Sequence, residues 1–413
     1  MVQTKYLNGM KAVNSLLENH LVIILGLLIY GSTALCQEPM PIDSVVAAME
    51  MENIEQSFLE MDKYFPSKRL PKSDQPFVFP NKRNIELPGE FKHSSNNYST
   101  AEFLDSSYTQ GLLVLENDTI VYENYWRGQE SNTAHISWSI AKSYISLLFG
   151  IAMEEGYLDD LNQTVDHYLP ELKGSGYEGV KIKDVLEMSS GVKFDESYSN
   201  PNSDISRWFG SFIQGKSQDS FAATLVNERK PGTYNQYVSI NTHVLGMILV
   251  KVTSKSITDY MQEKIWTPMG SEYDGYWLSD SEGMEMALGG LNATLRDYAK
   301  LGQLFLRKGK WGEMQIVSSN WVDESTTPSA EHLQPDSENS SSKGIGYGYQ
   351  WWIPKGDDGE ILAIGVFNQY IYINPTTNTV IVKNSANNNY YDWKNPHSST
   401  SVHLELFRKI ANR

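Results

Sequence analysis

The sequence predicts an α+β fold in which an antiparallel β-sheet is flanked by helices and interrupted by an inserted, mostly helical lobe. Three observations support this prediction: an early hairpin of strands, a helical middle part, and a late series of strands that ends in a helix. This order is expected when helices are inserted between the strands of one sheet. At 413 residues, the chain also exceeds the usual size of a single compact core, so we expect two lobes.

The early hairpin is predicted from two short runs of aliphatic and β-branched residues. The run GLLVL begins at Gly111 and the run TIVY begins at Thr119, with the turn-forming tripeptide Glu-Asn-Asp between them. Before the hairpin the chain is polar and interrupted by prolines. This part contains one helix-like segment, residues 42–64, and an Asn- and Ser-rich stretch at 94–100 that indicates a linker or surface loop.

The middle of the chain has the periodicity of helices. The apolar run from Ser139 predicts a helix that ends at Gly156, and further helical segments are predicted at 185–188, 243–252 and 256–266. The last of these begins at a serine, which is a common N-cap. These patterns predict the inserted helical lobe.

The last third of the chain alternates between one strong helix and several strands. Residues 294–308 predict a helix whose Thr294 and Asp297 resemble a capping box. The strands and the C-terminal helix that follow are predicted at residues 349–353, 361–367, 369–373, 379–383 and 400–411.

These elements divide the chain into four predicted parts. They are a signal sequence (1–36), an N-terminal extension (37–100), an α/β sheet domain built from 101–138 and 270–413, and a helical domain (139–269) with the Ser139 helix at the interface.

The signal sequence is predicted from the order of charged, apolar and small residues. Lys5 and Lys11 precede an apolar run at 21–30, which is short for a membrane span and is followed by small residues. Cleavage after Cys36 predicts an exported, periplasmic or secreted protein. Two alternatives remain open. Cys36 could be lipidated, in which case the protein would contact a membrane only through this lipid anchor, or the apolar segment could be an anchoring helix that is never cleaved.

Composition excludes several classes of function. The formal net charge of −16 and the lack of a basic run with interspersed aromatic residues argue against nucleic acid as a partner. Cys36 is the single cysteine, so we expect neither a disulfide nor a thiolate metal site in the mature chain. The eight histidines are scattered, and we expect no metal and no cofactor.

A pair of residues at the start of the Ser139 helix could form a nucleophile and its base. Ser139 and Lys142 are three residues apart and would share one helix face, and apolar neighbours would lower the pKa of the lysine. The Ser-x-x-Lys pattern also occurs at Ser190 and Ser340. Ser190 is followed by a glycine and Ser340 lies in a polar run, so these two occurrences are expected to be incidental.

Four segments together resemble a known family. They are SIAKS from Ser139, DESYSNP from Asp195, PGTYNQYVSINTHVLG from Pro231 and AIGVFNQYIYINP from Ala363. In this order they are similar to the 6-aminohexanoate-dimer hydrolases and related esterases, which have the class C β-lactamase fold of the penicillin-recognising serine hydrolases. The resemblance extends from about Leu112 to the C-terminus.

The resemblance implies roles for several residues. Ser139 would be the nucleophile, Lys142 the general base and Tyr237 the phenol that passes a proton to the leaving group. The backbone N–H groups of Ser139 and Val366 would form the oxyanion hole. The resemblance further implies substrate-binding positions at Tyr198, Ser239, Ile364, Gly365 and His397.

Two departures from the class C β-lactamase pattern bear on the substrate. Ser239 occupies the place of the asparagine in Tyr-x-Asn, as it does in the nylon-oligomer hydrolases. The segment Ala363-Ile364-Gly365 aligns with Lys-Thr-Gly, so the lysine that helps to bind a substrate carboxylate is missing. The serine argues against efficient β-lactam hydrolysis, and the missing lysine favours esters or amides that lack such a carboxylate.

The sequence therefore predicts an exported serine hydrolase that cleaves small-molecule esters or amides through an acyl-enzyme on Ser139. One alternative is a D-amino-acid peptidase, carboxypeptidase or weak β-lactamase that acts on cell-wall-type substrates. Another is a non-catalytic binding protein with the same fold. The sequence indicates no particular oligomeric state.

Overall fold

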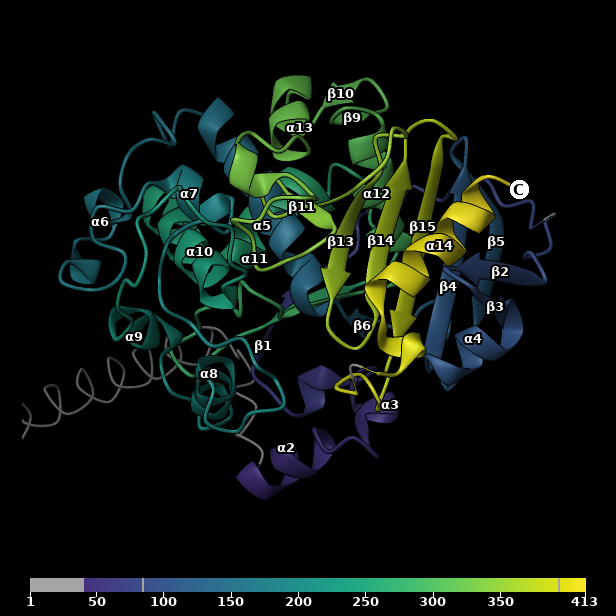
Figure 1. The fold of residues 1–413 in the computed structure, drawn as a ribbon. Helices are drawn as coiled ribbons and strands as arrows, with labels where there is room; N and C mark the ends of the chain where they lie inside the picture. The colour runs from purple at the N-terminus through teal and green to yellow at the C-terminus, as the bar shows by residue number, and fades with distance from the viewer. Residues whose placement is uncertain (1–40, 84, 393) are drawn as a thin grey trace, which may run out of the picture. The chain divides into compact units, whose positions relative to one another are not determined.

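The computed structural model describes residues 41–413 except 84 and 393, and these residues form one compact unit (Figure 1). The predicted signal sequence and its Cys36 lie outside the described residues. Within the described part, no helix combines the length and the apolar character that crossing a bilayer requires.

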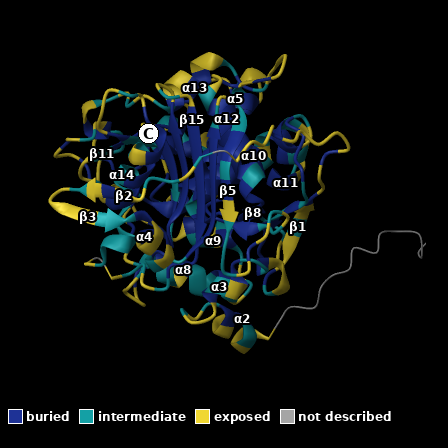
Figure 2. Ribbon diagram, turned by 90° about the vertical axis from the view of Figure 1, so that its right-hand side faces the viewer, coloured by how far each residue is buried: buried dark blue, intermediate teal, exposed yellow. Residues whose placement is uncertain are grey.

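A seven-stranded antiparallel sheet forms the centre of the unit (Figures 1 and 2). Its strands, in spatial order, are β11 (Ile345–Tyr347), β12 (Trp352–Pro354), β13 (Ile361–Gly365), β14 (Gln369–Asn374), β15 (Thr379–Ser385), β4 (Thr109–Glu116) and β5 (Thr119–Tyr125). The predicted hairpin is thus β4 and β5, and the late strands pair with it through β15.

Alternating side chains of the central strands face two separate layers of helices. On β4, Leu113 faces the larger core together with Leu301 and Leu304 of α12 (Leu295–Leu306). Leu112 faces the smaller core, which Leu406 of α14 (Thr400–Ala411) shares. Because successive strand residues point to opposite faces, one apolar run can cover both layers. The sheet is therefore buried on both sides (Figure 2).

Helices occupy the chain between β6 (His135–Ile136) and β7 (Gly275–Leu278). They are α5 (Ala141–Glu154), α6 (Val165–Tyr168), α7 (Ile182–Leu186), α8 (Asp204–Ile213), α9 (Gln218–Ala223), α10 (Ser239–Thr253) and α11 (Ile257–Met261), the last continued by a π-helical turn, Gln262–Trp266. This is the predicted helical insertion of the α+β fold. The exact boundary between a sheet domain and a helical domain stays a prediction.

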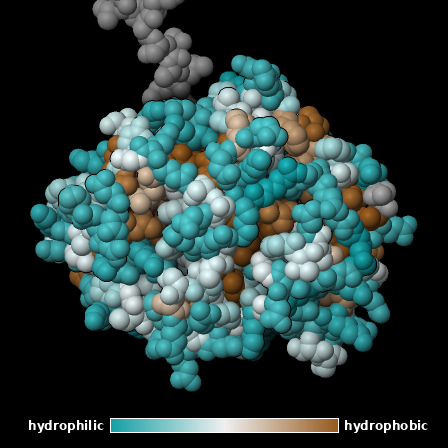
Figure 3. Space-filling view, turned by 90° about the horizontal axis from the view of Figure 1, so that it is seen from above, coloured by the Kyte–Doolittle hydropathy of each residue, from teal (hydrophilic) through white to brown (hydrophobic). Residues whose placement is uncertain are grey.

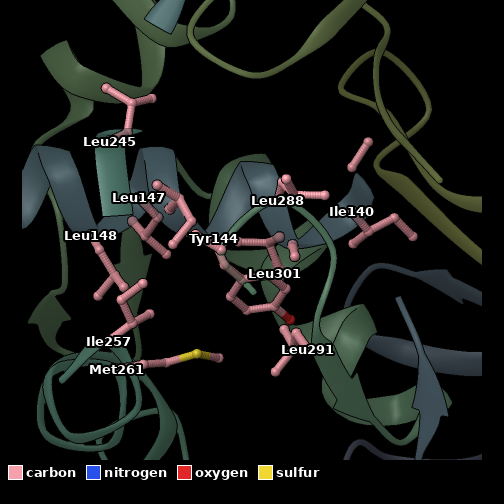
Figure 4. Packing of buried hydrophobic residues seen from close by; sticks show 14 of the residues in the cluster. Ile140, Tyr144, Leu147, Leu148, Leu245, Ile257, Met261, Leu288, Leu291 and Leu301 are labelled. Atoms are coloured by element: carbon pink, nitrogen blue, oxygen red, sulfur yellow. The ribbon is translucent and has the colours of Figure 1, made fainter. Parts of the chain in front are cut away.

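Helix α5 runs through the middle of the molecule and is buried on all sides except at its last two residues. Figure 4 shows Leu147 and Leu148 among side chains of the neighbouring helices, with Tyr144 near Leu301 of α12. A helix that is apolar all round belongs inside a large core. Its packed surroundings fix the N-terminal end of α5, which carries Lys142 and directly follows the turn with Ser139.

Smaller elements surround the central sheet. A four-stranded sheet has the order β1 (Ser67–Leu70), β7, β8 (Leu291–Ala293), β6, and two hairpins are formed by β2 (Glu90–His93) with β3 (Asn96–Ser99) and by β9 (Lys310–Trp311) with β10 (Met314–Gln315). Further helices are α4 (Thr100–Ser106) and α13 (Ser319–Ser325), with short 3₁₀ turns at Pro170–Leu172, Glu331–Leu333 and Pro396–Ser398. Figure 3 shows one face of the molecule, on which hydrophilic residues dominate and hydrophobic residues form separate small groups.

The N-terminal extension differs from its prediction in two places. Residues 42–64 form three short helices, α2 (Ile42–Ala48), α3 (Ile54–Ser57) and a 3₁₀ turn (Met61–Lys63), instead of one. The Asn53 side chain donates a hydrogen bond of 2.8 Å to the carbonyl of Ala47 and so stabilises the loop that breaks the helix. The stretch predicted as a linker at 94–100 contains β3 and the start of α4.

The late elements agree more closely with their predictions. The helix at 400–411 has the predicted bounds, and Thr294 caps α12 by accepting a hydrogen bond from the N–H of Asp297. Of the strand predicted at 349–353, residues 352–353 belong to β12, while β11 ends earlier, at Tyr347. Gln350 between them has a φ of 64°, a left-handed conformation that ends a strand.

Candidate active site

Ser139 lies at the junction between a strained turn and the central helix. It belongs to a 3₁₀ turn, Trp138–Ile140, directly before α5, whereas the sequence predicted it in the helix itself. The preceding Trp138 has a φ of 45°, which is rare for a bulky residue and typical of functional sites. The half-buried serine thus sits at the positive end of the α5 dipole, where a developing negative charge is stabilised.

Lys142 is buried beside Ser139. Its Nζ lies 3.1 Å from Oγ of Ser139 and donates a hydrogen bond of 2.6 Å to the backbone carbonyl of Leu288. The residue is 1% exposed, and burial lowers its pKa to about 7. A neutral amine keeps a hydrogen for Leu288 and offers its lone pair to the hydroxyl of Ser139, so this geometry suits a general base.

Glu196 faces Lys142 from a loop and was not predicted from the sequence. Its negative charge opposes the effect of burial and raises the pKa of Lys142, while burial raises the pKa of Glu196 itself. The carboxylate also accepts hydrogen bonds from the backbone and hydroxyl of Ser239 and, at 2.8 Å, from the hydroxyl of Tyr198. It is two residues before Tyr198 in the quoted run DESYSNP, but no local pattern indicates its contact with Ser239.

Tyr237 approaches Ser139 from the segment that precedes α10. Its ring stacks on that of Trp352 with centroids 5.3 Å apart, and Nζ of Lys142 lies 5.4 Å from the ring centroid. Burial raises the pKa of Tyr237 well above its usual value, and an interaction with the Ser139 side chain acts in the opposite direction. The phenol is therefore protonated at neutral pH and can supply a proton.

The end of strand β13 completes the site. Ser139 and Val366 line the same two pockets, and the oxyanion hole expected from their backbone N–H groups stays a prediction. A Cβ atom on Gly365 would lie 2.4 Å from the carbonyl oxygen of Ser137, closer than such atoms can approach. Glycine therefore permits the short distance between β13 and the turn that carries Ser139.

Two pockets meet at Ser139. The first, which we call the aromatic pocket, has a cavity volume of about 260 Å³ and is lined by Met49, Met51, Trp138, Ser139, Tyr198, Ile205, Ser206, Trp208, Phe209, Leu288, Gly289, Val366, Phe367 and Tyr391. The second, which we call the Tyr237 pocket, has a volume of about 300 Å³ and is lined by Ser139, Tyr198, Tyr237, Ser342, Ile345, Trp352, Ile364, Gly365, Val366, Tyr390 and Thr400.

The residues predicted to bind substrate do not all reach these pockets. Tyr198 lines both, and Ile364 and Gly365 line the Tyr237 pocket. Ser239 is fully buried and bonds to Glu196 instead. His397 is absent from the lining of either pocket in the described part of the chain, and its ring contacts Asn395 and Phe103.

The other two Ser-x-x-Lys pairs have different surroundings. Lys193, which follows Ser190, is exposed. Lys343, which follows Ser340, donates hydrogen bonds to the backbone carbonyls of Ser337 and Glu338. Neither lysine is desolvated in the way that Lys142 is. Among residues 41–413 without 84 and 393, no cluster of three or more His, Cys, Asp or Glu is arranged to hold a metal ion.

Comparisons with known proteins show the family to which the chain belongs. The model of the beta-lactamase family matches residues 105–392. A 6-aminohexanoate-dimer hydrolase from Paenarthrobacter ureafaciens is 30% identical over 291 residues, which cover 68% of this chain and 74% of that protein.

Solved structures show the same fold. One, described as a "putative 6-aminohexanoate-dimer hydrolase" from Bacillus anthracis, has a TM-score of 0.76 at 24% identity and covers 87% of this chain and 94% of that chain. A class C beta-lactamase has a TM-score of 0.54 at 17% identity over 78% of this chain and 98% of that chain. From the family match and these folds, we conclude that the chain belongs to the beta-lactamase family of hydrolases.

Proposed function

We propose that the protein is a serine hydrolase that cleaves ester or amide bonds of uncharged small molecules through an acyl-enzyme on Ser139. The observation that carries the proposal is the 3.1 Å contact between Oγ of Ser139 and Nζ of a buried Lys142 whose pKa is lowered to about 7. A lysine in solution would be protonated at neutral pH and could not act as a base.

The proposed acylation step uses three side chains. The Ser139 hydroxyl gives its proton to the Lys142–Tyr237 pair while Oγ forms a bond to the carbonyl carbon of the substrate. The resulting oxyanion accepts hydrogen bonds from the N–H groups of Ser139 and Val366. When this intermediate collapses, the bond to the leaving group breaks and the leaving group takes a proton from the Tyr237 side.

Deacylation reverses the roles of the same groups. A water molecule gives a proton to the Lys142–Tyr237 pair and its oxygen attacks the carbonyl carbon of the acyl-enzyme. The bond between the acyl group and Oγ then breaks, Ser139 regains its proton, and the carboxylic acid leaves.

The lining of the pockets supports an uncharged substrate. No lysine, arginine, histidine or carboxylate residue lines either pocket in the part of the chain that the structure describes. Ala363, which aligns with the lysine of Lys-Thr-Gly, is buried in the larger core. A substrate carboxylate would lose its water without gaining an ion pair here, and this disfavours penicillins and D-Ala-D-Ala peptides.

Covalent labelling tests the proposal. A fluorophosphonate probe should modify the protein at Ser139, and Ser139→Ala should lose both the label and the hydrolysis of p-nitrophenyl butyrate. Ser340→Ala is a matched control, because it removes another serine of the same Ser-x-x-Lys spacing and should keep both. A protein that takes up no label and hydrolyses no ester would instead be a binding protein. Faster turnover of nitrocefin than of the ester would favour the β-lactamase alternative.

Export is a separate part of the proposal and rests on the N-terminal sequence pattern alone. N-terminal sequencing of the mature protein should find Gln37 as the first residue. An acylated Cys36 would show the lipid-anchored form instead, and an intact Met1 would contradict cleavage.

A further inference from the structure

We propose that the aromatic pocket holds the acyl group of the substrate, that this group is an uncharged hydrophobic chain, and that Met49 and Met51 set its length. This inference rests on the proposed function, because it assigns the two pockets beside Ser139 to the two halves of the substrate. It adds a substrate class and two specificity-determining residues from outside the segment that matches the family model, which begins at residue 105.

The position of Tyr237 decides which pocket receives which half of the substrate. The proton donor must lie within hydrogen-bonding reach of the leaving-group atom. Tyr237 lines the second pocket and is not part of the aromatic pocket, whereas Ser139 and Val366 line both. A carbonyl carbon bonded to Ser139, with its oxygen held near Val366, therefore directs the leaving group toward Tyr237. The acyl chain must then extend into the aromatic pocket.

The chemistry of the aromatic pocket favours a hydrophobic chain. Its walls are methionine, aliphatic and aromatic side chains, and its serines are Ser139 and Ser206. A charged acyl chain would find no counter-ion among these residues. Burying one methylene group favours binding by a factor of about four, so a longer acyl chain should react faster until the pocket is filled.

Met49 and Met51 line the aromatic pocket and belong to the N-terminal extension, which is packed against the site. Phe58, just after α3, is fully buried and packs its ring against Trp138 and Phe367, with centroids 5.4 Å and 5.1 Å apart. This contact anchors the segment that carries Met49 and Met51 next to the nucleophile. Both methionines are half-buried, and their unbranched side chains can adapt to a ligand.

A chain-length series tests the assignment. For the unmodified protein, kcat/KM should rise from p-nitrophenyl acetate to the butyrate and on to the octanoate. Met51→Trp, which narrows the pocket, should lower kcat/KM for the octanoate at least tenfold relative to the acetate, and Met51→Ala should favour the longer ester. An unchanged chain-length profile in an active Met51→Trp protein would overturn the proposal.

A matched variant on the other side of Ser139 checks which pocket is which. Ile345→Ala enlarges the Tyr237 pocket, so it should change the preference between phenyl and naphthyl butyrate and leave the acyl-chain profile as it was. If Met51→Trp changes the leaving-group preference and Ile345→Ala changes the acyl preference, the two pockets have the opposite roles and the assignment is wrong.

Binding to a protein without the nucleophile separates this inference from the proposed function. Calorimetry with Ser139→Ala should show that octanamide binds more tightly than acetamide, and that adding Met51→Trp removes the difference. If the unmodified protein hydrolyses no ester and the variants still give this result, the assignment of the aromatic pocket holds and the proposed hydrolase function is refuted. Equal binding of the two amides would refute the assignment of the aromatic pocket, whether or not the protein hydrolyses esters.

Discussion

The backbone of Gly365 lies directly against the carbonyl oxygen of Ser137, so that a Cβ atom on the glycine would be 2.4 Å from this oxygen. The contact joins the last residue of β13 to the turn that presents Ser139. It therefore sets the distance between the two N–H groups proposed to bind the oxyanion, which follow Gly365 and Ser137 by one and two residues.

Gly365→Ala is expected to damage catalysis more than stability. The added methyl group must push β13 away from Ser137, and loss of one oxyanion-hole donor typically lowers kcat by about 100-fold to 1,000-fold. Steady-state kinetics with p-nitrophenyl butyrate and thermal unfolding measure the two effects. Gly89→Ala is the control, because a Cβ there meets no atom within 4 Å. Equal kcat in both variants would contradict a role of this contact in forming the oxyanion hole.

Long elements with a strong pattern could be predicted from the sequence. The helix at 400–411 and the hairpin of β4 and β5 were found because each buries one continuous apolar pattern. The single helix predicted at 42–64 was wrong, because the side chain of Asn53 bonds to the backbone and stabilises a loop within it. Such a competition between side chain and helix is decided by geometry that the sequence pattern does not contain.

The candidate site could be predicted only where its residues are close in sequence or belong to a recognisable motif. Ser139 and Lys142 are one helical turn apart, so spacing alone suggested their contact. Glu196 reaches Ser239 across 43 residues, and Phe58 reaches Phe367 across most of the chain. Contacts of this kind are determined by tertiary packing, so the roles of Glu196, Met49 and Met51 appeared only in the structure.

Hydrolysis should depend on the protonation of Lys142. Burial lowers its pKa to about 7. The amine is therefore protonated and inactive as a base at pH values below about 7, and neutral above. We expect kcat/KM for p-nitrophenyl butyrate to rise as the pH increases through this value. Lys142→Met should abolish the reaction while circular dichroism shows a folded protein. A rate that stays constant between pH 5 and 9 would remove Lys142 from the mechanism.

Glu196→Gln should move this pH dependence in a defined direction. The carboxylate raises the pKa of Lys142 by attraction, so its removal should lower that pKa and shift the rise of kcat/KM to lower pH. Glutamine keeps the size of the side chain and can still bond to Ser239. Glu313→Gln, an exposed position in the turn between β9 and β10, is the control and should leave the profile in place. A shift to higher pH would show that the carboxylate does not act on Lys142 as a charge.

Tyr237→Phe should discriminate between good and poor leaving groups. A p-nitrophenolate can depart without a proton, whereas an amine or an aliphatic alkoxide needs one in the transition state. Loss of a general acid typically costs about 100-fold to 10,000-fold, so kcat/KM should fall by this amount for an anilide or a methyl ester and much less for the p-nitrophenyl ester. Tyr347→Phe is the matched control, because its ring lies 6.3 Å from that of Tyr237 and is buried without lining either pocket. Equal losses for good and poor leaving groups in Tyr237→Phe would mean that the phenol orients Ser139 and does not protonate the leaving group. The acyl chain could then no longer be placed opposite Tyr237.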